Sequence, residues 1–184
     1  MIIYFCVTDR SPRGILKPVN AKDAKALKIH IIGGPGSGKT TLAGQLSKEY
    51  GIPYYDLDDL MWDNNAESYG TKRDPQERDA LLRGILETDD WIIEGVYYAW
   101  CGQCFETADR IYLLHVPRRV YRQRIIRRFV RRKLHLESGK RETLRSLRDL
   151  LRWADKFERV NLVAIRKVLC AYPDKVTEYG IRGR

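Results

Sequence analysis

Short apolar runs alternate along most of this chain with longer segments of helical periodicity. Apolar, β-branched runs predict buried strands, and apolar positions three to four residues apart predict helices that cover them. Strands are expected at residues 27–32, 52–58, 91–95, 110–116 and 175–179. Five strands that alternate with helices indicate an α/β fold, a three-layer sandwich with a parallel sheet, helices on both faces and right-handed crossovers.

Local sequence marks the ends of the first helices. The segment after the first strand has helical spacing at Leu42 and Leu46 and ends at Gly51. Asp74 and Pro75 open another helix that is expected to continue through Leu86, because proline suits the first helical position.

A long helix is expected after Pro117, which ends the fourth strand. Its apolar residues fall at i+4 spacing and are expected to form one stripe: Tyr121, Ile125, Ile126, Phe129, Val130 and Leu134. Residues 138–140 predict a break. A further amphipathic helix then runs towards Cys170, beginning with Leu144, Leu147, Leu151 and Ala154.

A glycine-rich loop separates the first strand from the first helix. Residues 33–40 read Gly-Gly-Pro-Gly-Ser-Gly-Lys-Thr, a complete G-x-x-x-x-G-K-[ST] motif in its diagnostic context. Such a loop points backbone N–H groups at a phosphate, and the helix adds its positive end. Lys39 is expected to reach the β- and γ-phosphates, and the Thr40 hydroxyl to hold Mg²⁺. We therefore expect ATP and Mg²⁺ as cofactors, with the nucleotide bound by Gly33, Gly34, Pro35, Gly36, Ser37, Gly38, Lys39, Thr40 and Thr41.

Carboxylates follow two of the predicted strands. Asp56 and Asp58 are expected to end the second strand on the same side, because strand residues two apart face alike. Glu94 ends the third strand. Ligands of parallel sheets lie beyond the carboxyl ends of the strands, so Asp58 and Glu94 join Thr40 as the predicted metal site. The alternatives are a solvated strand end for the aspartates and a structural hydrogen bond for Glu94.

The positive charge of the chain is concentrated in one segment. The net charge is +10, and residues 110–136 hold ten basic residues and no acid. Such a block needs a polyanion, a phosphate-rich substrate or an acidic neighbour. We expect one of its arginines to contact the transferred phosphoryl group, so Arg124, Arg127 and Arg128 join Lys39 as catalytic candidates. The alternative for several of these arginines is a solvated basic face.

The sequence gives little support for a disulfide-rich, zinc-binding, membrane or secreted protein. Four cysteines are too few for a disulfide framework, and the pair at Cys101 and Cys104 lacks the second pair that a zinc site needs, so reduced thiols are expected. No apolar run approaches the ~20 residues that span a bilayer. The first residues lack the basic lead and apolar length of a signal peptide. We therefore expect a cytoplasmic protein without a membrane partner.

Three stretches resemble the adenylate-kinase-like P-loop kinases known as DNA topology modulation proteins. They are GGPGSGKTTLAGQL at 33–46, YYDLDDLMW at 54–62 and DDWIIEGVYYAWCGQCFETADRIYLLHVPR at 89–118, and the resemblance covers roughly residues 28–180. This family is similar in build to adenylate, shikimate and gluconate kinases. The resemblance implies the sheet order 2-3-1-4-5, an acceptor-binding region after the second strand and an arginine-bearing lid after the fourth.

The resemblance also implies roles for particular residues. Asp58, Trp62, Glu94 and Tyr97 match the family's motifs, and we assign Asp58, Trp62 and Tyr97 to acceptor binding. Cys104 stands where we expect a basic residue from the family pattern, and this difference weakens the transfer of acceptor specificity from the family.

The expected organisation is one catalytic domain with an extension before it. Residues 1–27 are the extension and 28–184 a single P-loop kinase domain, with the acceptor-binding region at 54–90 and the Arg-rich lid at about 118–143. The preferred function is transfer of the ATP γ-phosphate to a nucleotide or a small hydroxylated metabolite. The alternative is a nucleic-acid-associated ATPase or an NTP-binding regulatory protein whose Arg-rich helix lies along a phosphate backbone. The sequence leaves the acceptor and the oligomeric state open.

Overall fold

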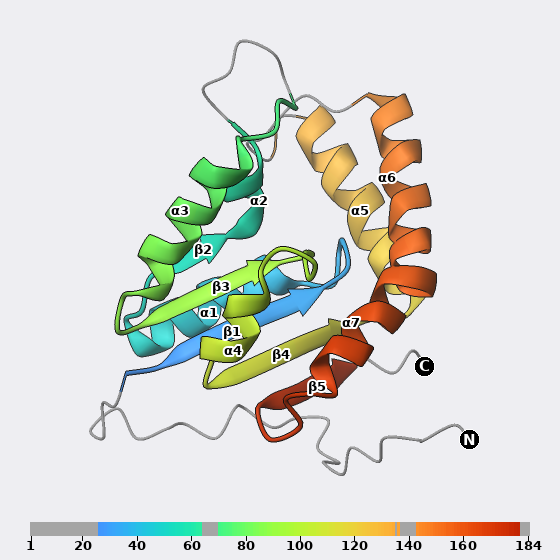
Figure 1. Ribbon diagram of the computed structural model, residues 1–184. Coiled ribbons are helices and arrows are strands. Elements are labelled where there is room, and N and C mark those ends of the chain that lie inside the picture. Colours follow the sequence, from blue (N-terminus) through green and yellow to red (C-terminus); the bar gives the residue numbers. More distant parts are fainter. Residues whose placement is uncertain (1–25, 64–69, 135, 137–142, 181–184) are drawn as a thin grey trace.

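A single parallel sheet organises the computed structural model, which describes residues 26–63, 70–134, 136 and 143–180. The strand order is β2-β3-β1-β4-β5 (Figure 1). The strands are β1 (Lys28–Gly33), β2 (Tyr54–Asp56), β3 (Trp91–Gly95), β4 (Arg110–His115) and β5 (Val176–Gly180). The α/β class and the strand order implied by the resemblance are therefore confirmed. Most of the expected N-terminal extension, Cys6 and the break at 138–140 lie outside the described residues.

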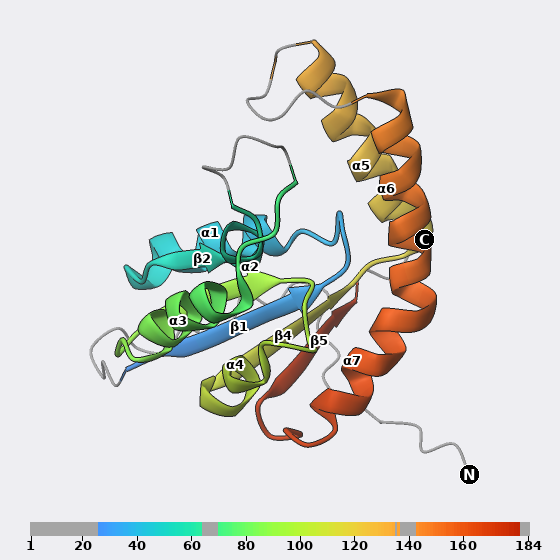
Figure 2. The same cartoon turned by 45° about the horizontal axis from the view of Figure 1, so that its top comes forward.

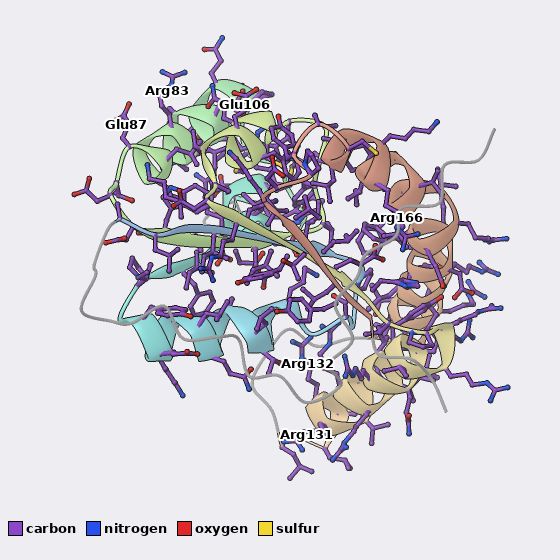
Figure 3. All side chains as sticks on the ribbon, turned by 90° about the horizontal axis from the view of Figure 1, so that it is seen from below. Arg83, Glu87, Glu106, Arg131, Arg132 and Arg166 are labelled. Atoms are coloured by element: carbon purple, nitrogen blue, oxygen red, sulfur yellow. The ribbon has the colours of Figure 1, made fainter. Side chains whose placement is uncertain are left out.

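Helices cover both faces of this sheet. The helices of the described residues are α1 (Lys39–Tyr50), α2 (Leu57–Met61), α3 (Pro75–Leu86), α4 (Gly102–Thr107), α5 (Arg118–Lys133), α6 (Leu144–Lys156), the π-helical turn η1 (Phe157–Asn161) and α7 (Leu162–Leu169). Figure 3 shows α1 on one side of the sheet and α3 and α4 on the other. Within the described ranges, none of these helices has the length and apolarity needed to cross a bilayer.

Two apolar cores lie on the two faces of the sheet because successive strand residues point to opposite sides. On β1, Ile29 and Ile31 pack with Ala43 and Leu46 of α1. On the other face, Ile93 belongs to a larger cluster that includes residues of α3, α4 and α7 and the residue before α4: Leu82, Leu86, Cys101, Cys104, Phe105, Leu162, Ile165 and Leu169. Both faces of the sheet are thereby covered, and its carboxyl edge is left to the connecting loops.

The helices α5 and α6 stand side by side as a hairpin beyond one end of the sheet (Figure 2). Tyr121 and Ile125 of α5 are buried with Ala154 of α6. The expected single stripe on α5 is wrong, because Ile126, Val130 and Leu134 are 42%, 45% and 62% exposed. Ile126 and Val130 each lie about 100° around the helix from a buried residue, Ile125 or Phe129, and α6 covers one face only.

His30 is a buried titratable group in the central strand β1. Its ring packs edge-on against Phe105 with centroids 4.8 Å apart, and among the described residues neither ring nitrogen has a well-formed hydrogen bond. Burial lowers the pKa of His30 from 6.5 to about 3, against a smaller opposing effect from the backbone of Ile93. The folded chain therefore keeps this imidazole neutral at pH values where the unfolded chain protonates it.

We expect this histidine to weaken the fold in acid. The neutral His30 leaves the free energy of unfolding at its full value above the unfolded pKa of 6.5. This free energy then falls as the pH drops from 6.5 towards 3, with a limiting slope of about 1.4 kcal/mol per pH unit. His30→Asn cannot take up this proton, so its free energy of unfolding should fall less between about pH 7 and about pH 5. Urea unfolding of the wild type and of His30→Asn across this range measures how the free energy of unfolding depends on pH. An equal dependence in both proteins would contradict a buried, neutral His30.

Candidate active site

The loop between β1 and α1 is held against the body of the protein by close contacts that require glycine. Gly36 and Gly38 have φ values of +71° and +104°, a left-handed conformation that side chains disfavour. A Cβ on Gly33 would lie 2.5 Å from the Leu114 carbonyl oxygen, and one on Gly34 would lie 2.9 Å from the Phe157 ring. The loop is therefore packed between the end of β4 and η1.

Lys39, Thr40 and Glu94 meet at the start of α1. The Lys39 ammonium donates to the Gly34 carbonyl oxygen at 3.2 Å and lies 4.0 Å from the Glu94 carboxylate, while the Thr40 hydroxyl donates to Glu94 at 2.5 Å. Glu94 is 2% exposed. Burial lowers the pKa of Lys39, and the Glu94 carboxylate opposes this shift. The hydroxyl and carboxylate oxygens suit Mg²⁺, which binds through few protein oxygens and keeps water and phosphate ligands.

The second strand is shorter than the sequence predicts. It ends at Asp56, and Asp58 lies in the first turn of α2, so the expectation that both aspartates end the strand is wrong. The reason is local, because the Asp56 carboxylate accepts a hydrogen bond from the Asp58 backbone N–H at 2.9 Å and caps the helix. Burial, and then the nearby Glu94, raises the pKa of Asp56 to about 7.

Tyr97 connects the loop after β3 to α2. Its hydroxyl donates to the Asp58 carboxylate at 2.7 Å, and burial raises the pKa of this phenol. Neither Tyr97 nor Trp62 lines the cavity that contains Asp58, so the structure does not bring these two acceptor-binding candidates to its wall.

One cavity of about 660 Å³ gathers most of the predicted site. Its walls come from the glycine loop and α1, from the ends of β2 and β3, and from the facing surfaces of α5 and α6. The residues that line it are Pro35, Gly36, Gly38, Lys39, Thr40, Thr41, Asp56, Asp58, Glu94, Gly95, Val96, Arg124, Ile125, Arg128, Arg132, Leu150 and Trp153.

The arginines of α5 divide into four groups. Arg124 donates to the Gly36 and Ser37 carbonyl oxygens at 3.1 and 2.8 Å. Arg128 lines the cavity, and its Nε is buried without a hydrogen-bond partner in the described part of the chain. Arg127 is exposed and does not line the cavity, so the structure does not bring this catalytic candidate to the site. Others pair elsewhere, since Arg118 and Arg122 both contact the Asp155 carboxylate.

Sequence reasoning missed the contribution of α6. Leu150 and Trp153 line the cavity opposite the loop, and Trp153 packs against Phe157 with ring centroids 5.9 Å apart. Both lie beside the predicted apolar stripe of this helix, at a spacing of three residues. The signal was present in the periodicity, but it does not distinguish a core position from a cavity wall.

The fold and the loop resemble those of adenylate-kinase-like P-loop kinases. A glycine loop follows the central strand β1 of a parallel sheet in the order 2-3-1-4-5, and an arginine-bearing helix follows β4. The chain belongs to the AAA domain family, whose model matches residues 32–145.

Individual relatives support this placement over part of the chain. The uncharacterized protein YqaC of Bacillus subtilis is 28% identical over 98 residues, which is 53% of each chain. Adenylate kinase isoenzyme 5 of Bos taurus is 34% identical over 76 residues, 41% of this chain and 12% of that protein. This chain thus spans about half or less of these relatives. The structure of TT1252 from Thermus thermophilus shares the fold, with a TM-score of 0.51, 20% identity and coverage of 87% and 91% of the two chains.

The contact between β3 and α2 generates a stability prediction. A Cβ on Gly95 would lie 2.8 to 3.1 Å from side-chain atoms of Leu57, so Gly95→Ala should destabilise the fold by about 1–3 kcal/mol. Gly84, inside α3, is the matched control, because a Cβ added there would meet no atom within 4 Å from other parts of the described chain. Gly84→Ala should stabilise the fold by about 0.5–1 kcal/mol. Chemical denaturation measures both variants, and a neutral Gly95→Ala would contradict the tight contact.

Proposed function

We propose that this protein transfers the γ-phosphate of ATP to a hydroxyl group of a small acceptor. One observation carries the proposal: the glycine loop, Lys39, the Thr40–Glu94 pair and the arginines of α5 line a single cavity with Asp58. Phosphoryl transfer needs little covalent chemistry from the protein, and it depends on positioning and on stabilising negative charge. This cavity offers both in one place.

Each group has a distinct role in this proposal. The loop N–H groups and Lys39 bind the β- and γ-phosphates. Thr40 and Glu94 hold Mg²⁺, which neutralises phosphate charge when it is bound. Arg128 offers a guanidinium to the transferred group, and Asp58 orients the acceptor. Arg124 acts through the loop, because its hydrogen bonds are to loop carbonyl oxygens.

The lid in this proposal is larger than the sequence range. Residues 118–143 cover α5 and the segment after it, but α6 supplies Leu150 and Trp153 to the same cavity. We propose that both helices close over the nucleotide. The nucleic-acid alternative gains no support from the site, because Arg118, Arg122 and Arg124 already have partners within the protein.

Lys39→Ala tests the nucleotide site. The wild-type protein should be stabilised by ATP with Mg²⁺, by about 2.7 kcal/mol when the ligand is at 100 times its Kd. Lys39→Ala should lose this stabilisation, because the ammonium in the loop is removed. Lys48→Ala, an exposed lysine in the last turn of the same helix, is the matched control and should keep it. A full thermal shift in Lys39→Ala would count against the proposal.

Arg128→Ala tests whether Arg128 is the arginine of α5 that contacts the transferred phosphoryl group. It should lower the rate of ATP turnover by about 100-fold or more while changing nucleotide binding less, because its proposed role is in the transition state. Arg127→Ala removes the same charge from the exposed side of the helix and should have little effect on either quantity. Steady-state ADP release measures both variants, and an equal loss in both would refute this division of the arginines.

A further inference from the structure

The proposed active-site cavity has two walls of opposite charge. The loop and α5 provide the cations Lys39, Arg124, Arg128 and Arg132, and the ends of β2 and β3 with α2 provide the carboxylates Asp56, Asp58 and Glu94. Figure 1 shows β2 and α2 on one side of the loop and α5 and α6 on the other. The basic wall suits the triphosphate of ATP, so the acceptor is left to face the acidic wall.

Asp58 is the group of this wall that is available to an acceptor. It is exposed and is held in place by the hydrogen bond from the Tyr97 hydroxyl, which is a neutral donor. Over the described ranges, no cation lies within ion-pair distance of Asp58 or Asp56, whereas Glu94 faces Lys39. Asp58 therefore presents a negative charge and free acceptor lone pairs to a ligand.

The arginines nearest in sequence to this wall are engaged elsewhere. Arg73 donates to the Leu60 carbonyl oxygen at 3.1 Å and pairs with Glu77 at 2.5 Å. Arg78 pairs with Asp79 and lies 4.3 Å from the centre of the Trp100 ring. Neither lines the cavity. A phosphate on the acceptor needs cations or a cluster of donors, and at this wall it would meet carboxylates.

We infer that the acceptor is a hydroxyl compound that carries no phosphate, either neutral or with an ammonium group, and not a nucleoside monophosphate. This inference rests on the proposed function. Asp58 accepts a hydrogen bond from the reacting hydroxyl or its neighbour. In the transfer, the acceptor oxygen forms a bond to the γ-phosphorus, the bond from that phosphorus to the β–γ bridging oxygen breaks, and ADP leaves. The hydroxyl proton passes to the Asp58 carboxylate and then to water.

The first experiment measures AMP binding while a non-hydrolysable ATP analogue with Mg²⁺ saturates the donor site. The wild-type protein should bind AMP weakly, and Asp58→Asn should bind it about threefold to tenfold more tightly at low salt because a repulsive charge is gone. This gain should shrink as salt is added. Asp174→Asn, an exposed aspartate in the turn before β5, is the matched control and should not change AMP binding. If the wild type binds AMP well and Asp58→Asn weakens it, the inference is overturned.

The second experiment compares acceptors by the ADP that they release from ATP. The panel contains neutral sugars and polyols, amino sugars, and nucleoside monophosphates. Stimulation by an unphosphorylated compound, with a raised KM in Asp58→Asn, supports the inference, and stimulation by a nucleoside monophosphate overturns it. A thermal shift with ATP and Mg²⁺ is recorded first. Its absence would refute the proposed function itself, whereas a shift followed by nucleoside monophosphate phosphorylation would refute the acceptor class alone.

Discussion

The carbonyl groups of the glycine loop impose the constraint on which the site depends. A loop that turns its N–H groups towards a ligand leaves its carbonyl oxygens on the other side, where they need donors of their own. Lys39 supplies one to Gly34, and Arg124 supplies two, to Gly36 and Ser37. Arg124 is far from the loop in sequence, so satisfying the loop backbone also fixes one face of α5 against it. Arg128 lies one turn further along the same face, so it is thereby turned to the cavity.

The sequence predicts the bounds of helices and strands most accurately where neighbouring residues determine them. The helix α3 runs from Pro75 to Leu86 as expected, because Asp74 accepts hydrogen bonds from the backbone at its start and proline follows. The strand β3 also has the expected bounds. The second strand was predicted too long, since the apolar run does not reveal that the Asp56 side chain caps a new helix. The six-residue helix α4 was not predicted, because it is too short to show a period.

The site was predictable in part for the same reason. The loop, Glu94 and Asp58 follow from a motif and from strand ends, which are local features. The choice between Arg127 and Arg128 is not local, because it depends on which side of α5 the helix α6 covers. Part of the positive charge of residues 110–136 is paired with a carboxylate within the protein. Asp155 contacts Arg118, Arg122 and Tyr121, and the Arg118 guanidinium holds the pKa of this carboxyl below its usual range.

The π-helical turn η1 has a consequence for the geometry of the cavity. A π turn contains one residue more than an α turn, so η1 sets the rotational phase of α6 relative to α7. Phe157, its first residue, rests against Gly34, while Leu150 and Trp153 lie one to two turns before it. Without the extra residue, everything on the α6 side would rotate by about 100° around the helix axis. The indole of Trp153 would then turn away from the cavity, so one inserted residue determines which side of α6 faces it.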